Sequence, residues 1–408
     1  SSNSVNLTTV ITQIENATPN TVSNKGLLIR SNSPISCYYD IANGSNGDIY
    51  ALKGNNALGT KFTLPFQMGF IGRPLPLYTT DFIILATENN TTIEITPTRN
   101  LVGNPAGSTF TIRLNRGETY VCTASSDLST GKPGGTLVKS DKPIAITTKD
   151  DSISIPGQFC GDTAGDQLIP DRLAGTEFVL LKGYFNISPD LYYVFATEDG
   201  TTVQTSEGRS ALINAGEFFS AKLSLESVYV TSNKPVQVFQ ISGFGCEIGG
   251  AVIPSLKCTG STQVTAVRAT AGTEQFYVNV LSTFDIINDF TINGSNALIG
   301  PNSFSQVPGT NGKWGYVRIT IPSSVVASGQ SIIIKNNSGK FHVGIIQGGP
   351  SSTARFGYFS DFSTNTILLR DPDDPSNLIR DEKIFCYNTT VGINAFNSEP
   401  GIVFSWIG

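Results

Sequence analysis

The chain has 408 residues and a net charge of −5, with 27 Lys and Arg against 32 Asp and Glu, so it has no basic stripe to neutralise a nucleic-acid backbone. No stretch approaches the ~18 apolar residues that span a bilayer, which excludes a direct membrane span. The polar start SSNSVNLTTV lacks the regions of a signal peptide, so we expect a mature piece of a longer protein. Only 14% of residues are charged, which is typical of an extracellular β protein.

The first 25 residues form a Thr- and Asn-rich lead-in. Within residues 1–25 the segment VNLTTVITQI alternates in polarity, and it could add a strand to the fold. A flexible terminus is the other interpretation, because chain ends are often poorly ordered.

A repeated phrase then organises the chain. GLLIRSNSPISCYY begins at Gly26, GTLVKSDKPIAITT at Gly135 and SVYVTSNKPVQVFQ at Ser227, and a fainter copy without proline, SIIIKNNSGKFHVGI, begins at Ser331. Copies that recur roughly every 100 residues indicate a repeat architecture. Each copy reads as strand, tight turn and strand, with the proline at the corner because it fixes φ and lacks an N–H donor.

A second repeated feature lies between the copies. DFIILATENNTTIEI, residues 81–95, matches LYYVFATEDGTTVQT, residues 191–205. Alternation on both sides of Asn-Asn or Asp-Gly predicts a two-residue β-hairpin, whose turn needs positive φ.

These features predict an all-β fold built from three repeats over residues 26–362. A unit of ~100 residues holds about eight short strands, or two four-stranded meanders. Six such sheets could close into a six-bladed β-propeller. We favour this fold because the repeated phrase lies in the middle of a unit, as expected if the two chain ends interlock to close a ring. Tandem β-sandwiches, each with its own core, are the alternative.

Six cysteines are scattered without a CxxC pair, which argues against zinc. Cys246 and Cys258 bracket the Gly-rich segment CEIGGAVIPSLKC, so we predict that they form a disulfide, with two buried thiols as the alternative. Cys37 aligns with core positions of the other copies and could be a thiol or a bridge. The pairing of the remaining cysteines, at 122, 160 and 386, stays open.

Binding residues are carried disproportionately on loops held by a rigid scaffold. The segment from Asp150 to Asp166 is longer than an ordinary hairpin connection, and residues 242–250 and 41–47 occupy the same place in other units. We expect these three loops to share one face suited to multivalent attachment. The candidate ligand-binding residues on and beside these loops are Asp150, Asp151, Phe159, Asp162, Phe244, Tyr38 and Tyr39.

The motifs together carry a family resemblance. The phrase with its proline, DQLIPDRLAGTEFV, ATEDGTTV and GCEIGGAVIPSLKCTGS occur in an order that resembles the N-terminal domain of IgGFc-binding proteins, over roughly residues 20–362. That family includes a secreted mucus protein and many bacterial cell-surface proteins, and this Ile- and Asn-rich sequence is more similar to the bacterial members. The resemblance implies a non-enzymatic extracellular adhesion or binding module, but no residue here matches a known Fc contact.

The composition changes after residue 362. Residues 363–383 read as a linker rich in proline and aspartate, in which Asp371, Asp373 and Asp374 could hold calcium. A solvated linker is the favoured interpretation, since the EF-hand glycine and glutamate are missing. Residues 384–408 look like the start of an Ig-like or PKD-like repeat that stops before such a domain could close.

Catalytic patterns are scarce. His342 is the only histidine, so a Ser-His-Asp triad or a multi-histidine metal site is not expected, and no phosphate-binding loop motif stands between a strand and a helix. Propeller glycosidases need only paired carboxylates, which makes them a third and weaker alternative. We therefore expect no enzyme and no cofactor other than a possible calcium. The sequence favours a secreted or cell-surface adhesin that engages glycans or glycoproteins, with a non-binding structural stalk as the alternative.

Overall fold

The computed structural model describes most of the chain through residue 362. The described ranges are 4–33, 35–41, 46–72, 78–155, 160–185, 188–257, 259–270, 274–349 and 353–362, together with the backbone of 365–367 and 383–385. The fold is all-β and antiparallel in nearly every pairing, as the sequence predicts. Among the described residues, no helix is long and apolar enough to cross a membrane.

The N-terminal segment is mostly irregular. Its elements are η1 (Thr8–Val10), α1 (Ile11–Ile14), β1 (Val22–Ser23), β2 (Cys37–Ile41) and β3 (Asp48–Leu52). The alternating segment near residue 10 forms a short helical turn rather than the expected strand, and β1 pairs with β9 instead. β2 and β3 form an antiparallel hairpin.

The first unit contains one strand that is far longer than the rest. Its elements are η2 (Gly54–Ala57), β4 (Gly59–Thr63), β5 (Ile71–Gly72), β6 (Thr80–Ala86), β7 (Thr91–Thr96), β8 (Phe110–Leu114), β9 (Thr119–Thr123), η3 (Ser129–Gly131), β10 (Leu137–Ser154) and β11 (Asp162–Gln167). The first half of β10 pairs with β4 and β7, and its later residues pair with β6 and then β11. One strand therefore belongs to both sheets of a β-sandwich.

The second unit repeats this topology. Its elements are η4 (Asp171–Leu173), β12 (Gly175–Leu181), β13 (Tyr184–Phe185), β14 (Leu191–Ala196), β15 (Thr201–Thr205), β16 (Ser210–Ile213), β17 (Phe218–Lys222), β18 (Ser227–Gly245) and β19 (Glu247–Val252). β18 pairs first with β12 and β15 and then with β14 and β19, as β10 does with its partners.

The third unit splits the long strand in two. Its elements are β20 (Gln263–Val267), β21 (Gln275–Thr283), η5 (Phe284–Asp289), β22 (Phe290–Ile292), η6 (Pro301–Ser303), β23 (Ser305–Gln306), β24 (Trp314–Thr320), β25 (Ser331–Asn336), β26 (His342–Gly349) and β27 (Thr353–Tyr358). β25 pairs with β20 and β22, whereas β26 pairs with β21 and β27. The break falls where this copy of the phrase lacks proline.

Pro143 and Pro235, the prolines of the second and third copies of the phrase, occupy the same environment. The Thr87 hydroxyl donates to the Pro143 carbonyl at 2.6 Å, and the Thr197 hydroxyl donates to the Pro235 carbonyl at 2.7 Å. Pro34 lies outside the described residues. The repeat is therefore structural in the first two units. The tight turn predicted at each proline is wrong, because β10 and β18 continue through Pro143 and Pro235 with only a shift in register.

The predicted ATENNTT and ATEDGTT hairpins are wrong in their pairing. β6 pairs with β9 and β10, while β7 pairs with β8 and β10, so the turn between them crosses from one sheet to the other. Asn90 and Gly200 nonetheless adopt the expected positive φ, at 55° and 66°. A local turn signal thus gave the backbone conformation but not the partner strand.

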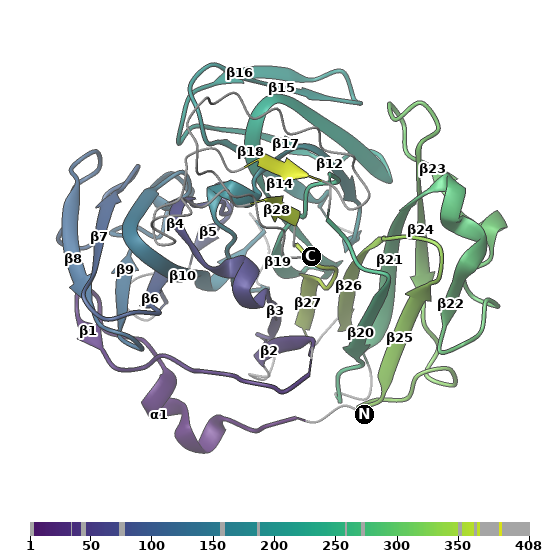
Figure 1. The fold of residues 1–408 in the computed structure, drawn as a ribbon, viewed down its shortest axis with the longest axis horizontal. Coiled ribbons are helices and arrows are strands. Elements are labelled where there is room, and N and C mark those ends of the chain that lie inside the picture. Colours follow the sequence, from purple (N-terminus) through teal and green to yellow (C-terminus); the bar gives the residue numbers. More distant parts are fainter. Residues whose placement is uncertain are drawn as a thin grey trace, which may run out of the picture.

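The three units surround a common centre, to which each sends its last hairpin (Figure 1). In each of the first two units the long strand joins two halves of one continuous sheet into a barrel-like sandwich, whereas the third unit consists of two separate sheets. The units are arranged around an axis rather than in a row. The first two units share one hydrophobic core, in which Phe66 and Phe239 pack at 5.5 Å, and the third unit has a core of its own.

The C-terminal region is largely outside the described residues. Only β28 (Asn365–Ile367) and β29 (Lys383–Phe385), which pair with each other, are described there. The expected linker over 363–383 and the expected Ig-like or PKD-like segment over 384–408 otherwise lie outside the described part of the chain.

Candidate functional site: the central ring and its disulfide-linked end

Four hairpin strands form a ring at the centre of the molecule. β3 contacts β11, β11 contacts β19, β19 contacts β27, and β27 contacts β3. Small residues allow the close approach, since a Cβ on Gly249 would lie 2.8 Å from the Phe356 nitrogen, and one on Gly165 would lie 2.1 Å from the Thr148 oxygen. The ring is therefore too crowded for ordinary side chains at these points.

Buried carboxylates join the ring strands in place of a β-ladder. From β11, Asp162 accepts the Ile248 N–H of β19 at 2.7 Å, and Asp166 accepts the Val252 N–H of the same strand at 3.0 Å. Both contacts span 86 residues, so they lie in one register between β11 and β19. The carboxylates thus satisfy backbone donors that would otherwise be orphaned.

Asp48 closes the ring. Its carboxylate accepts the Gly165 N–H of β11 at 3.2 Å and the Phe356 N–H of β27 at 3.3 Å, so one fully buried side chain joins three strands. Burial raises the pKa of Asp48 well above its ordinary value, although these backbone donors act in the opposite direction.

A buried ion pair lies at the other end of β3. Lys53 Nζ is 2.8 Å from Asp166 Oδ1, and both side chains are 2% exposed. Burial lowers the pKa of Lys53 and raises the pKa of Asp166, because each charge has lost its water. The mutual attraction of the two groups opposes both changes.

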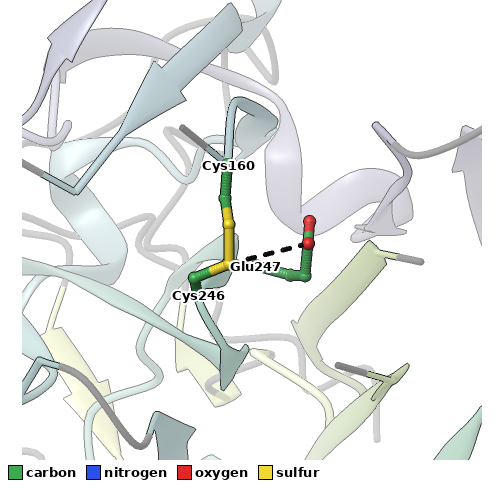
Figure 2. A group of neighbouring side chains, drawn as sticks. All are labelled: Cys160, Cys246 and Glu247. Carbon is green, nitrogen blue, oxygen red and sulfur yellow. Dashed lines mark hydrogen bonds between the residues drawn. A yellow bond between two sulfur atoms is a disulfide. The ribbon is translucent and has the colours of Figure 1, made fainter. Parts of the chain in front are cut away.

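The starts of the ring strands carry the only disulfide found among the described residues. Cys160, just before β11, is bonded to Cys246, the single residue between β18 and β19, with Cα atoms 6.0 Å apart (Figure 2). The predicted Cys246–Cys258 bridge is therefore wrong. The adjacency of β11 and β19 brings Cys160 to Cys246, while Cys258 lies outside the described residues. Cys37 and Cys122 are free thiols.

Two acidic side chains lie next to each other beside the disulfide. Asp162 is fully buried next to Glu247, and Glu247 Oε1 lies 3.8 Å from Cys246 Sγ (Figure 2). Burial, and then the charge and hydrogen bond of Glu247, raise the pKa of Asp162 to about 9. Asp162 is therefore protonated at neutral pH.

The same cluster does not make a metal centre in this state. Cys160, Cys246 and Glu247 form the single group of three or more metal-ligating side chains among the described residues. Its sulfurs are bonded to each other, so neither is a thiolate, which is the form that binds metal. The expected calcium ligands Asp371, Asp373 and Asp374 lie outside the described residues.

Asp150 and Asp151, predicted as loop residues, lie in strand β10 and stabilise the fold. Asp150 is 1% exposed, and its carboxylate binds Lys132 Nζ at 2.5 Å and the Thr80 hydroxyl at 2.8 Å. Asp151 accepts the N–H of Thr79 and pairs with Lys149. Because β10 continues to Ser154 and β11 begins at Asp162, the predicted loop is mostly a hairpin, and Asp150 is not accessible to a ligand.

The predicted aromatic contacts are half-buried. Tyr38 meets the edge of Phe359 at 5.5 Å, Tyr39 lies 6.5 Å from Tyr50, and Phe244 stacks on Tyr277 at 5.7 Å. Phe159 lies outside the described residues. The structure thus brings Asp162 and Phe244 to the disulfide-linked end of the ring, because Phe244 and Gly245 directly precede Cys246.

Sequence reasoning missed Asp48, Cys160 and Glu247 as members of this centre. Cys160 and Cys246 are separated by the same 86 residues as the Asp162–Ile248 and Asp166–Val252 contacts, a register between β11 and β19 that the sequence alone does not show. The starts of β11 and β19 lie at one end of the ring, since Asp162 meets Ile248 and Cys160 is bonded to Cys246.

The class of protein follows from this arrangement. The carboxylates of the central ring bind backbone N–H groups or Lys53. They therefore hold the strands together, as expected of a rigid β scaffold whose surface loops and hairpin ends bind a ligand. The sequence profile described as IgGFc binding protein matches residues 49–347, and the chain belongs to this family. Family membership and the disulfide are consistent with an extracellular ligand-binding module.

Other comparisons add little. A search of curated proteins finds no relative. Among solved structures, two B repeat units of the collagen-binding protein of Staphylococcus aureus are similar to the chain at 8% identity, covering 67% of this chain and 70% of that one. The TM-score is 0.12, so this similarity carries no inference about the fold.

Proposed function

We propose that the chain is an extracellular adhesion module that binds a protein ligand, glycosylated or not, through the disulfide-linked end of its central ring. The observation that carries the proposal is the Cys160–Cys246 bridge, which fixes the ends of two hairpins from different units. A preorganised surface loses less conformational freedom when it binds, which increases affinity.

Half-buried aromatic surface supports this assignment. Phe244 lies next to the disulfide and stacks on Tyr277, which stacks in turn on Tyr184 at 3.6 Å. Aromatic side chains are enriched at protein interfaces because they bury a large area with few rotatable bonds. The family name makes the Fc region of IgG the first ligand to test, and glycosylated and deglycosylated Fc would separate a protein contact from a glycan contact.

We further propose that the module acts without catalysis. Its only histidine, His342, is 2% exposed. Burial lowers the pKa of His342 to about 4, so this imidazole is neutral and lies away from solvent. A structural stalk that binds nothing is the competing proposal.

Surface plasmon resonance on the full chain tests the proposal, with Fc, a panel of surface glycoproteins and a glycan array as analytes. We expect saturable binding that Phe244→Ser weakens by at least tenfold. The matched control is Leu212→Ser on the outer strand β16, where the side chain is 72% exposed, and it should bind like the wild type. Equal binding by both variants, or no saturable binding in the panel, would favour the stalk.

A further inference from the structure

The first copy of the repeated phrase is not packed like the others. Leu27 and Ile29 are 50% and 45% exposed. The residues at the corresponding positions are all 0% exposed; these are Thr136, Val228 and Ile332 for Leu27, and Val138, Val230 and Ile334 for Ile29. Two side chains of core type thus lie in solvent, where full burial of each would be worth ~1.5–3 kcal/mol.

The difference arises from missing partner strands. In the three complete units, the first half of the phrase is flanked by two strands: β10 by β4 and β7, β18 by β12 and β15, and β25 by β20 and β22. Residues 27–31 belong to no strand, and the described backbone bonds nearby are those of Gly26 with Gly117 and of Ser33 with Ser31 Oγ. Toward the described residues, both backbone edges of residues 27–31 are therefore open.

The second half of the same copy is in its usual place. β2 follows directly and forms with β3 the hairpin that completes the central ring. In Figure 1 the quarter of the molecule beside β2 contains only α1 and irregular chain, where the other quarters contain complete sandwiches. Residues 27–31 thus occupy the place in the repeat that the inner strand of a sandwich holds in the other units, and the described chain supplies no partner strands for it.

The repeats also indicate the chemistry of the missing strand. Arg30 corresponds to Lys139, Thr231 and Lys335. On one edge these residues face Glu94, Gln204 and Thr291, and on the other they face Lys61, Glu177 and Gln263. Five of these six partners carry a side-chain oxygen that can accept a hydrogen bond, and of such residues glutamate also matches the charge of Arg30. An incoming strand with a glutamate between apolar residues would therefore match this edge. A second copy of residues 25–30 would not, because antiparallel pairing brings Lys25 near Arg30 of the other copy, and like charges on facing strands are destabilising.

We propose that residues 27–31, here called the open edge, are a docking site for a β-strand of another protein that carries a glutamate opposite Arg30 and β-branched or aromatic residues on either side. The strand would add by main-chain hydrogen bonds, and Leu27 and Ile29 would be covered by its apolar side chains. The surface lies on the N-terminal segment and is independent of the disulfide-linked end of the ring.

The probe is a fluorescently labelled synthetic peptide with the β12 sequence GTEFVLL, whose glutamate faces position 231 in the second unit. Fluorescence anisotropy with the full chain should show saturable binding, and hydrogen exchange should show new protection confined to residues 27–31. Ile29→Lys should weaken binding at least tenfold. Leu212→Lys, at an exposed position of the outer strand β16, should not change it.

A charge exchange tests the register. Arg30→Glu should weaken binding of the peptide about threefold to fivefold, the range of one cross-strand pair. A peptide with lysine in place of its glutamate should show the reverse preference. A structural role for Arg30 would not produce this reversal.

Four results would overturn the proposal. They are no binding at millimolar peptide, binding that Ile29→Lys leaves intact, and concentration-dependent dimerisation that Ile29→Lys abolishes, which would make a second copy the occupant. The fourth is peptide binding that appears only after residues 363–408 are removed, which would make the chain's own C-terminal segment the occupant.

Discussion

Removal of the Cys160–Cys246 bridge should destabilise the molecule by several kcal/mol. The bridge closes a loop of 86 residues, for which the chain-entropy relation gives about 4.6 kcal/mol at 25 °C. Both cysteines are only partly buried, so serine at these positions leaves no core cavity. The double variant Cys160→Ser/Cys246→Ser isolates the cross-link from packing.

The assay is urea unfolding followed by far-UV circular dichroism, with the free energy of unfolding extrapolated to water. Cys37→Ser is the matched control, because Cys37 is also half-buried but is free, and we expect it to cost less than about 1 kcal/mol. Mass spectrometry of a non-reduced digest should recover the peptide linking Cys160 to Cys246. A loss below about 1 kcal/mol in the double variant would refute the loop-closure argument.

Three further substitutions test the buried charges. Asp162, protonated because Glu247 and burial raise its pKa to about 9, favours folding least at high pH, so stability should fall between pH 4 and 9 and Asp162→Asn should flatten that slope. His342, whose pKa burial lowers to about 4, should cause stability to fall as pH drops from 6.5 towards 4, and His342→Gln should remove this loss. Lys132→Met leaves the Asp150 carboxylate buried without its cation and should cost about 3–5 kcal/mol, measured by urea unfolding.

Each of these has a matched comparison. Asp285→Asn, at an exposed position, should leave the pH profile unchanged, and an Asp162→Asn profile identical to wild type would contradict the raised pKa of Asp162. Unfolding curves of His342→Gln that keep the acid slope would assign that slope to other groups. If Lys132→Met/Asp150→Leu recovers none of the lost stability, the cost lies in packing rather than in an unpaired charge.

The sequence predicted the local parts of the fold well. The recurrence of the phrase in the first two units and the positive φ at Asn90 and Gly200 depend on residues close in the chain. The tight turn expected at Pro143 and Pro235 was wrong, because one continuous strand runs through each proline and only the register shifts there. The partner strands could not be predicted in the same way. Which of two sheets a strand joins depends on packing between residues that are distant in sequence.

The centre was the least predictable part. Residues 150–166 contain four aspartates, glycine and serine, a composition typical of a loop, but in the ring Asp162 and Asp166 accept backbone N–H groups of the neighbouring strand β19. Polar residues are favourable there because they bond to otherwise unpaired N–H groups, an arrangement that propensity does not describe. The wrong disulfide prediction has the same origin, because Cys246 was paired with Cys258, the nearest cysteine in the sequence, rather than with Cys160 on the neighbouring hairpin.

The closure at Asp48 has a consequence for how the molecule forms. Its bond to Phe356 joins residues 308 positions apart, so the ring cannot be completed until almost the whole described chain is present. At ~5–20 residues per second during synthesis, this delay is roughly 15 to 60 seconds. Throughout that interval the first hairpin has only some of its neighbours, and contacts of such long range are the slowest to form. Chaperones that hold exposed strand edges would act on this molecule during that period, and errors of assembly should concentrate at the junction of its two ends.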